Sequence, residues 1–454
     1  MPDPSRSLLR HRDFVKLWTA ETISVFGTQI TLLALPLIAA TTLNVTPFEF
    51  GLLGAIEFLP FILLSLPAGV WVDRMRRRPI LIAGDVVRAV ALLSIPIAFA
   101  LDGLTIWQLY TVGFINGCAT VFFDVAYMSY LPALVDRDQI IDGNSKLETS
   151  RSAAFIVGPG IAGFLIGAIS APFAILVDSV SFAVSALFLG VIRRREPKPE
   201  RQVDEHGQEA SMRSEIAAGL RYVLGHRYLR SIAATTGSSN FFSNILFAVL
   251  LLFLVRELGF TPELIGIAFS IGAVGFLIGA VLAGRIGGRS GVGPTIVASA
   301  FIAGAATLLV AIAPADLAFA FIAASVFIGS LANSIYNISQ VSLRQAITPQ
   351  SMQGRMNATM RFIVWGTIPI GAIVGGFLGG TIGLQPTIWV AAIGGMFVAL
   401  PVLLSPVRSI RAMPEPVDDT APATSDGDEI LATEAADEGV VPAGRGSYAD
   451  VSED

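Results

Sequence analysis

The sequence predicts an all-α polytopic membrane protein with twelve transmembrane helices in two six-helix halves. Composition is the first reason: 53% of the 454 residues are hydrophobic and only 14% are charged, which is too apolar for an ordinary soluble protein. The second reason is that apolar stretches of about 20 residues, the length that crosses a bilayer core of roughly 30 Å, recur along nearly the whole chain. The third is that the two halves of the chain resemble each other in sequence.

Each of the apolar stretches is expected to be a helix. Lipid offers no partner for an unpaired backbone group, and a membrane barrel would show short strands of alternating polarity instead. The first stretch is expected to stay as a membrane span, because it is too long for a signal peptide and no convincing cleavage site follows it. The twelve expected spans cover approximately residues 17–41, 49–71, 80–101, 107–131, 152–170, 172–192, 231–255, 263–284, 292–313, 316–341, 362–382 and 386–405.

Basic residues predict the orientation of these spans, because Lys and Arg accumulate on the cytoplasmic side of short membrane loops. With the N-terminus inside, the gaps expected outside hold only Arg256. We therefore expect a multi-pass protein of the cell membrane with both termini in the cytoplasm. The basic residues of the gaps expected inside are Arg74, Arg76, Arg77, Arg78, Arg137, Lys146, Arg193, Arg194, Arg195, Arg285, Arg289, Arg344 and Arg355.

The chain also repeats itself. A shift of 215 residues places Pro47 and Gly51 on Pro262 and Gly266. Two halves related in this way indicate a parallel repeat about an axis along the membrane normal. The repeat predicts that the halves have the same internal arrangement.

Polar segments separate and follow the two halves. Ile216, Leu220, Val223 and Leu224 form one apolar stripe at helical spacing, which predicts a helix lying on the inner membrane surface. The last 43 residues are acidic, rich in Pro, Ala and Asp and nearly free of aromatic side chains, so disorder is expected there. The expected organisation is an N-terminal six-helix half (1–192), a cytoplasmic linker with an amphipathic helix (193–230), a C-terminal six-helix half (231–408) and a disordered acidic tail (409–454).

The loop after the second span carries the pattern G-x-x-x-D-R-x-x-R-R, formed by Gly69, Asp73, Arg74, Arg77 and Arg78. With this motif, the six-plus-six arrangement resembles the major facilitator superfamily over about residues 8–408. The strings "GDVVRA", "GPGIAG", "LVDSVSF" and "GRMNATMR" further resemble its drug and siderophore exporter branch, which includes enterobactin exporters and macrolide-efflux transporters. The resemblance implies a secondary active transporter that exports a small amphipathic, drug-like or siderophore-like molecule by proton antiport and alternating access.

The partners implied are a small-molecule substrate, protons and the lipid bilayer, with no nucleic acid and a monomer as the family default. Uptake of a nutrient or sugar by symport or uniport is an alternative, and an intramembrane enzyme or receptor is a remote one. An enzyme would need clustered ligands or a nucleophile with its base, and all three histidines lie in segments expected to be cytoplasmic. The single cysteine, Cys118, excludes a cysteine-based metal site. We therefore expect no enzymatic activity, cofactor or metal.

Charged residues near the expected cytoplasmic ends are candidates for a gate. In the family, the loop after the second span latches the inside shut, and the resemblance implies this role for Asp73. For the arginines, membrane orientation is the alternative role. Asp85 with Arg88, and Glu148 with Arg151, are spaced three residues apart and can share a helix face, either as static pairs or as a network that breaks between conformations. The gate candidates are Asp73, Arg74, Arg77, Asp85, Arg88, Glu148, Arg151 and Arg361.

Glu57 and Asp124 are the candidates for proton coupling. Glu57 lies inside the second span with no basic residue within about one turn. Burial disfavours the charged form of an unpaired carboxylate, so such a group can take up a proton near neutral pH. Contact with a cationic substrate and a hydrogen-bonded structural role are the alternatives. For Asp124 and Asp178, structural roles are the favoured alternative, and Glu21 is expected to be solvated.

Polar amides within the spans mark a candidate substrate cavity. In a repeat of this kind the site lies near the midplane between the halves, and the first, fourth, seventh and tenth spans line it in the family. The alternative is that the amides tie helices together by hydrogen bonds, which contribute ~0.6–2 kcal/mol each. The amides are Gln29, Asn116, Asn240, Asn244, Asn333 and Asn337.

The fifth span contains the run Gly158-Pro159-Gly160. Such a run kinks a helix and allows close packing against it. A packing kink is one interpretation. The resemblance to antiporters implies another, in which a pliable and tightly packed fifth span limits leakage through the closed pore.

Overall fold

The computed structural model describes residues 8–73, 75–136, 139–193 and 212–414. Within these ranges the side chains of Leu66, Val70, Asp73 and residues 212–217 are not described. The described ranges contain helices and no strand, and twelve of the helices are long and apolar enough to cross a membrane, which confirms the expected number. The chain is therefore a multi-pass α-helical membrane protein. The expected tail beyond residue 414, and Arg74, Arg137, Arg194 and Arg195, lie outside the described residues.

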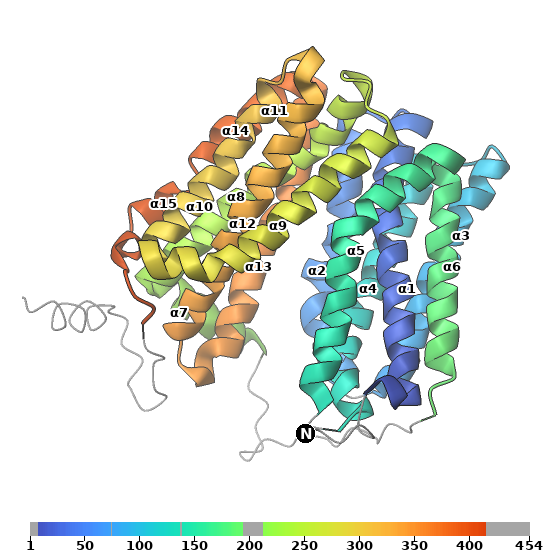
Figure 1. Cartoon of the computed structure of the whole chain (residues 1–454), viewed down its shortest axis with the longest axis horizontal. Coiled ribbons are helices and arrows are strands. Elements are labelled where there is room, and N and C mark those ends of the chain that lie inside the picture. Colours follow the sequence, from blue (N-terminus) through green and yellow to red (C-terminus); the bar gives the residue numbers. More distant parts are fainter. Residues whose placement is uncertain (1–7, 74, 137–138, 194–211, 415–454) are drawn as a thin grey trace, which may run out of the picture.

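The first six spanning helices form one bundle (Figure 1). In it, α1 packs against α5 and α6, α3 packs against α4 and α6, and α2 packs against α4. At the start of α2, Thr46 N donates to Glu49 Oε2 at 2.7 Å and Glu49 N donates to Thr46 Oγ1 at 3.3 Å, a reciprocal cap that fixes where the helix begins. The helices are η2 (Leu8–Arg10), α1 (Arg12–Leu37), its continuation η3 (Ile38–Thr42), α2 (Pro47–Asp73), α3 (Arg77–Ala100), α4 (Ile106–Leu134), α5 (Ile140–Ile169) and α6 (Ala171–Gly190).

The last six spanning helices form the second bundle (Figure 1). Here α8 packs against α13 and α14, and α12 packs against α9 and α10. Two of the spans are interrupted near one end, so that each consists of a long and a short helix. The helices are α8 (Arg227–Arg256), α9 (Pro262–Ser290), α10 (Val292–Ala306) with α11 (Leu308–Ala311), η5 (Ala315–Leu317), α12 (Ala318–Ala346), α13 (Gln350–Thr381), α14 (Leu384–Met396) with α15 (Leu400–Leu403), and η6 (Pro406–Ser409).

Two helices extend well beyond the apolar stretches that predict them. α5 begins at Ile140 and not near residue 152, and α13 begins at Gln350 and not near residue 362. Hydropathy marks only the part of a helix that is compatible with lipid, whereas backbone hydrogen bonding continues through polar turns. Both extensions are rich in polar side chains, so they continue the helices without adding to the apolar stretches.

A shorter helix, α7 (Met212–Gly225), lies between the two halves of the sequence. It packs against the start of α13 and against α8. The apolar stripe expected to face one surface is divided: Val223 is fully buried, whereas Leu220 and Leu224 are 39% and 46% exposed. The side of α7 that contacts α13 carries Gly219 and Val223, and both residues are buried. Leu220 and Leu224 are not on that side, which explains why they remain exposed.

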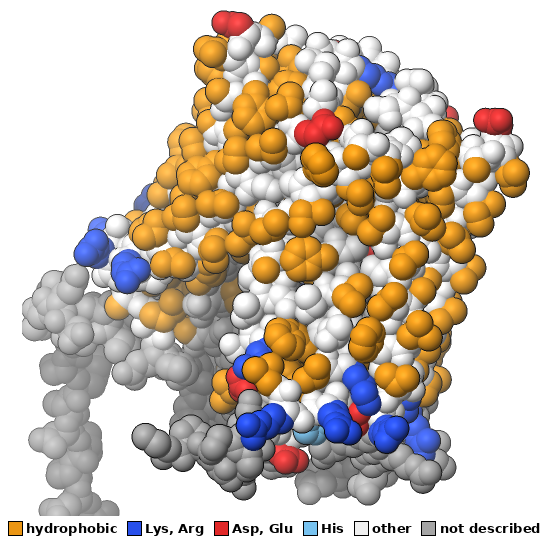
Figure 2. Space-filling model, turned by 45° about the vertical axis from the view of Figure 1, so that its right-hand side comes forward, with side chains coloured by type: hydrophobic (Ala, Val, Ile, Leu, Met, Phe, Trp, Pro, Cys, Tyr) orange, Lys and Arg blue, Asp and Glu red, His pale blue; other side chains and the backbone are white. Residues whose placement is uncertain are grey.

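The bundle has two chemically different ends. The basic end carries the start of α1 together with Arg78 and Arg193, and Figure 2 shows Lys and Arg side chains gathered there. The opposite, distal end is formed by the connections near Asn44, Gly103 and Ala171.

The two halves meet near the distal end and separate toward the basic end (Figure 1). The contacts between them come mainly from two helix pairs, α2 with α13 and α5 with α9. Three of the spanning helices, α4, α12 and α13, carry exposed polar side chains toward the basic end, on the side of the space between the halves. These side chains are Asp124, Asn333, Asn337 and Arg361.

Glycines bring the backbones of both helix pairs into direct contact. A Cβ atom on Gly376 of α13 would lie 2.7 Å from the carbonyl oxygen of Pro47 in α2, and one on Gly163 of α5 would lie 2.4 Å from the carbonyl oxygen of Pro262 in α9. Pro47 and Pro262 are the residues that the internal repeat superposes. The two crossings are therefore equivalent, and both depend on the absence of a side chain.

We predict that Gly163→Val destabilises the contact between the halves, because its side chain meets backbone atoms that have no room to yield. The expected loss is about 1–3 kcal/mol, the usual cost of overpacking. Thermal unfolding of the purified protein in detergent measures it. Gly284→Val is the matched control, since a Cβ atom there meets no atom within 4 Å; equal losses in both variants would contradict the prediction.

Candidate functional site

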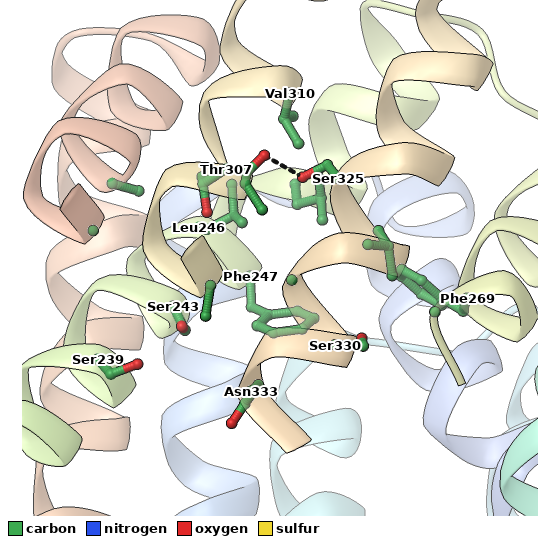
Figure 3. Close-up of a pocket in the computed structure, with 18 of the residues that line it drawn as sticks. Ser239, Ser243, Leu246, Phe247, Phe269, Thr307, Val310, Ser325, Ser330 and Asn333 are labelled. Carbon is green, nitrogen blue, oxygen red and sulfur yellow. Dashed lines mark hydrogen bonds between the residues drawn. The ribbon is translucent and has the colours of Figure 1, made fainter. Parts of the chain in front are cut away.

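A cavity of about 490 Å³ lies in the C-terminal half, on the side that faces the N-terminal half. Residues of α8, α9, α10, α12 and α14 form most of its wall, and residues of α1 and α5 close one side. Figure 3 shows its polar side chains along two of these helices, with Ser239 and Ser243 on α8 and Ser330 and Asn333 on α12. The volume lies in the range that is usual for small-molecule sites.

The structure brings two of the six predicted amides into this cavity. Gln29 of α1 and Asn333 of α12 line it, and so does Pro159 from the Gly-Pro-Gly run. Asn116 does not, because none of the lining residues comes from α4. The amides that line the cavity thus come from both halves, and their role in substrate binding stays a prediction.

The other amides make hydrogen bonds within the C-terminal half. Asn240 Nδ2 donates to the carbonyl of Val364 at 3.1 Å, which ties α8 to α13. Asn244 Nδ2 donates to the carbonyl of Asn240 at 2.8 Å, and Asn337 Oδ1 accepts from Gln340 Nε2 at 3.1 Å. The alternative role expected from the sequence, a hydrogen bond that ties two helices together, describes Asn240. Asn244 and Asn337 bond within their own helices.

Several hydroxyl groups in the cavity wall were not singled out from the sequence. They belong to Ser239 and Ser243 on α8, Thr307 beyond α10 and Ser330 on α12. The only local signal is the spacing of Ser239 and Ser243, which are four residues apart and so share one helix face. Serine is common enough in membrane helices that this spacing alone does not distinguish a cavity from a helix contact.

In the N-terminal half, the partner of Arg151 is Glu21. Arg151 Nη2 and Nε donate to Glu21 Oε1 at 2.8 and 3.1 Å, and the guanidinium carbon lies 4.9 Å from the centre of the Tyr127 ring. Two expectations are therefore wrong: Glu21 is only 3% exposed, and Arg151 pairs across helices and not with Glu148 on its own helix. Glu148 itself is exposed.

The second expected pair is present on α3. Arg88 Nη2 lies 2.5 Å from Asp85 Oδ1, and both residues are buried. The guanidinium carbon of Arg88 lies between two rings, 4.3 Å from the centre of Phe123 and 4.1 Å from that of Phe182. These contacts with α4 and α6 favour a static role for the pair, since the centres of two aromatic rings lie within 4.3 Å of the guanidinium carbon.

Asp178 is bonded within the same half. Its carboxylate accepts hydrogen bonds from the hydroxyl of Thr31 on α1 and from that of Ser181, the latter at 2.9 Å. It is 1% exposed. These contacts join α6 to α1 and are in keeping with the structural role favoured from the sequence.

Glu57 and Asp124 differ from the acids above. Glu57 is half-buried against α4, with its Cγ 2.9 Å from the position that a Cβ atom on Gly113 would take. Asp124 is exposed toward the space between the halves, where Arg151 and Arg361 act on it electrostatically. Among the described residues, neither carboxylate has a hydrogen-bond or ion-pair partner. They are the intramembrane acids most open to protonation or to a new partner.

The latch motif is only partly described. The side chain of Asp73 and all of Arg74 lie outside the described residues, so the latch role of Asp73 stays a prediction. Arg78 donates from Nε to the carbonyl of Leu189 at 2.9 Å and also bonds the carbonyl of Gly190. A cation at the C-terminal end of α6 is favourable, so Arg78 fastens α3 to α6 in addition to its expected role in orientation.

The Gly158-Pro159-Gly160 run packs on both of its neighbours. A Cβ atom on Gly158 would lie 2.4 Å from Gln29 Cγ of α1, and Gly160 N donates to Ser270 Oγ of α9 at 2.9 Å. The run therefore sits where α5 meets the other half, directly beside the cavity.

Among the described residues, no three His, Cys, Asp or Glu side chains come together in a way that could hold a metal ion. The candidate site thus consists of the neutral cavity and the unpartnered carboxylates of Glu57 and Asp124.

Comparison with known proteins gives the same architecture. The model of the Major Facilitator Superfamily matches residues 17–243 and 232–430. Macrolide efflux protein A of Streptococcus pyogenes is 23% identical over 402 residues, which are 88% of this chain and 97% of that protein. Multidrug efflux pump Tap of Mycolicibacterium fortuitum is 26% identical over 400 residues, covering 85% and 91% of the two chains.

Solved structures resemble the chain in fold. A bacterial homologue of the iron transporter ferroportin, in an inward-facing state, superposes with a TM-score of 0.67 at 17% identity and covers 88% of this chain and 99% of its own. A bacterial homologue of the lysosomal transporter Spinster, inward-facing and unoccupied, gives 0.64 at 13% identity, with 87% and 97% covered.

We predict that Arg151→Gln destabilises the protein more than Glu21→Gln does. Removal of the arginine leaves a carboxylate that is 3% exposed without its partner, whereas the side chain of Arg151 is 39% exposed and can be solvated when Glu21 is neutralised. The expected cost of Arg151→Gln is about 1–3 kcal/mol, measured by thermal unfolding in detergent. The double variant should recover part of it, and Glu148→Gln serves as a control; the reverse order of the two single variants would exclude this account of the pair.

Proposed function

Since the chain belongs to the Major Facilitator Superfamily, we propose that it exports a small amphipathic molecule across the cell membrane in exchange for protons. The observation that carries the proposal is the arrangement of the halves: they are in contact at the distal end, they separate toward the basic end, and a cavity faces the space between them. A substrate would therefore enter from the basic end, where the exposed side chains lie.

Orientation determines what this arrangement means for transport. Lys and Arg mark the cytoplasmic side of membrane proteins, and the basic end carries them here. With that end in the cytoplasm and both termini inside, the structure is open inward and closed outward. An exporter takes its substrate from the cytoplasm or the inner leaflet in such a state.

Transport then requires the two halves to rock about the site, so that the distal contacts open while the basic end closes. The glycine crossings suit this movement, because at each of them one backbone rests directly on the other near the distal end. The aromatic contacts of the same helix pairs, Phe58 with Trp365 and Phe155 with Phe276, lie further from that end. The distal end is also held by Arg256, whose Nη2 donates to the carbonyls of Ala40 at 3.0 Å and Val45 at 2.9 Å. These bonds join the end of α8 to the connection between α1 and α2.

The proton is proposed to bind at Glu57 or Asp124. Both carboxylates lack a described partner, so protonation of either one changes the local charge without first breaking an ion pair. Asp124 faces cations of both halves, Arg151 and Arg361, and Glu57 lies at the contact of α2 with α4. A change of charge at these places would alter the balance between the inward-open and outward-open states.

The direction of transport is supported by two similarities. The relatives reported above are an efflux protein for macrolides and a multidrug efflux pump, and the Gly158-Pro159-Gly160 run resembles that of antiporters. Uptake by symport is the opposing outcome of the experiment below.

We predict that substrate-dependent proton release is lost in Glu57→Gln. Everted membrane vesicles with an acid interior and a pH-reporting dye would be exposed to antibiotics, lipophilic dyes, catecholate siderophores and sugars. The unaltered protein should release protons when a substrate is added, whereas the variant cannot carry the proton. Glu49→Gln, on the same helix but in its first turn at the distal end, is the matched control and should keep the response.

Two results would count against this proposal. If Glu57→Gln retains both the response and its pH dependence, Glu57 is not the proton site, and Asp124→Asn is then the decisive variant. If a compound enters energised right-side-out vesicles together with protons, the protein works as a symporter.

We also predict that Arg256→Gln increases opening at the distal end. The loss of two hydrogen bonds from a charged donor should destabilise the closed form by about 1–2 kcal/mol, a factor of about 5–30 in the population of the open form. The reporter is Ala372→Cys in a Cys118→Ser background, because Ala372 is 5% exposed and lies at the α2–α13 crossing. The measurement is the rate at which a membrane-impermeant maleimide labels this cysteine. Glu257→Gln is the control, and an unchanged rate in Arg256→Gln would remove Arg256 from the proposed mechanism.

A further inference from the structure

The cavity in the C-terminal half has no charged lining. Among the described residues that form its wall there is no Asp, Glu, Lys, Arg or His. A charged group moved from water into such a site finds no counter-ion, and the cost of its lost hydration is not repaid. The wall therefore discriminates by charge, whatever the shape of the molecule.

The charges of the N-terminal half do not supply the missing counter-ion. Glu21 and Arg151 bond each other at 2.8 Å, and Asp85 and Arg88 do so at 2.5 Å, so both pairs are internally neutral. Glu57 and Asp124 have no described partner, but neither lines the cavity. Glu57 lies against α4, and Asp124 lies closer to the basic end than Gln29, the residue of α1 that reaches the wall. A fixed charge bound in the cavity would remain unpaired.

Several hydroxyl groups in the wall are free to bond a ligand. Elsewhere on α8, serine hydroxyls donate to carbonyls of their own helix: Ser231 to Arg227 at 2.8 Å and Ser238 to Ala234 at 2.7 Å. Within the described residues, the hydroxyls of Ser239 and Ser243 make no such bond. They are directed to the cavity side of α8 in Figure 3.

The same contrast holds on α12. Ser325 donates to the carbonyl of Ala306 at 2.7 Å, the dashed line of Figure 3. Ser330 and Asn333 have no described partner. Hydroxyls and amides both donate and accept, so the two rows on α8 and α12 can bond ether, carbonyl and hydroxyl groups without requiring a charge.

Aromatic and small residues form the rest of the wall. Phe247, 58% exposed, presents its ring to the space among the labelled residues of Figure 3, and Phe242 and Phe269 also line the cavity. The depth of the cavity depends on small residues such as Gly329, where a Cβ atom would have only Ala306 Cβ at 3.7 Å and Ala303 O at 3.9 Å within 4 Å. A planar apolar body can therefore lie against the rings.

We infer that this cavity is the substrate site and that it selects uncharged amphipathic molecules, with an apolar and preferably aromatic body and neutral oxygen or nitrogen acceptors, over molecules with a fixed charge. The inference rests on the proposed export function for its biological meaning and names the substrate class for that function. It assigns recognition to Ser239, Ser243, Ser330 and Asn333, and the size limit to Gly329.

The test uses two dyes with nearly the same ring system. Nile red is neutral and carries a ring carbonyl, whereas Nile blue carries a cationic iminium in its place. Equilibrium dialysis of the purified full-length protein against protein-free detergent of the same composition measures binding without interference from partition into micelles. We expect Nile red to bind at least about tenfold more tightly than Nile blue, because only the cation enters the neutral wall unpaired.

Two variants locate and explain the preference. Gly329→Leu should reduce Nile red binding about tenfold or more, because its Cβ atom would have room, at 3.7 Å or more from its neighbours, and the rest of the side chain would occupy the cavity. Gly284→Leu is the control and should bind normally. Asn333→Asp keeps the shape of the side chain and adds a negative charge, so it should raise Nile blue affinity about tenfold. Asn337→Asp, one turn further along α12 and outside the wall, should not.

The outcomes separate this inference from the proposed function. Equal affinity of the unaltered protein for both dyes, or Nile red binding that Gly329→Leu leaves intact, would overturn the inference. Binding is measured without a proton gradient, so a failure of Nile red to release protons from everted vesicles, with binding as expected, would count against proton antiport and leave the substrate class standing. If only cationic dyes were exported in exchange for protons, proton antiport would be supported and the inferred substrate class would be wrong.

Discussion

The close approach of α2 to α13, and of α5 to α9, is the contact on which the arrangement of the two halves depends. At each crossing a glycine lets one backbone rest on the carbonyl of a proline at the start of the partner helix. No side chain stands between the helices at these glycines. Further from the distal end the same helix pairs meet through aromatic rings, Phe58 with Trp365 at 5.8 Å and Phe155 with Phe276 at 5.6 Å between ring centres. Nearer the basic end, Asp124, Asn333 and Arg361 are exposed.

The two halves divide the chemistry between them. Among the described residues, the buried Asp and Glu lie in the N-terminal half. Glu21 pairs with Arg151 and Asp85 with Arg88, and Asp178 accepts hydrogen bonds from two hydroxyl groups. The cavity, in contrast, lies mainly in the C-terminal half and is neutral. The ion pairs lie within the N-terminal half, whereas the cavity wall carries no fixed charge, so the two kinds of polar group lie in different parts of the molecule.

Equivalent positions in an internal repeat need not have equivalent roles. Pro47 and Pro262 correspond in sequence and make the same contact. Arg256, in contrast, bonds the connection between α1 and α2 through two carbonyl groups. These hydrogen bonds run from the end of α8 to the connection between α1 and α2. They therefore make the distal end asymmetric, even though the two glycine crossings beside them are related by the repeat.

By itself, the sequence determined the properties that depend on local composition. The number of spans and the Asp85–Arg88 pair depend on neighbours within a few residues, where spacing and hydropathy are sufficient. The tertiary structure alone decided which distant groups meet. From its position near the end of a span, Glu21 is expected to be solvated, yet α5 brings Arg151 to it. Asn240 and Asn333 have the same side chain and similar depth, but only packing places one in a helix contact and the other in the cavity wall. The physical reason is that a side chain's environment in a helix bundle is set by the rotation and crossing of whole helices, which a single stretch of sequence does not contain.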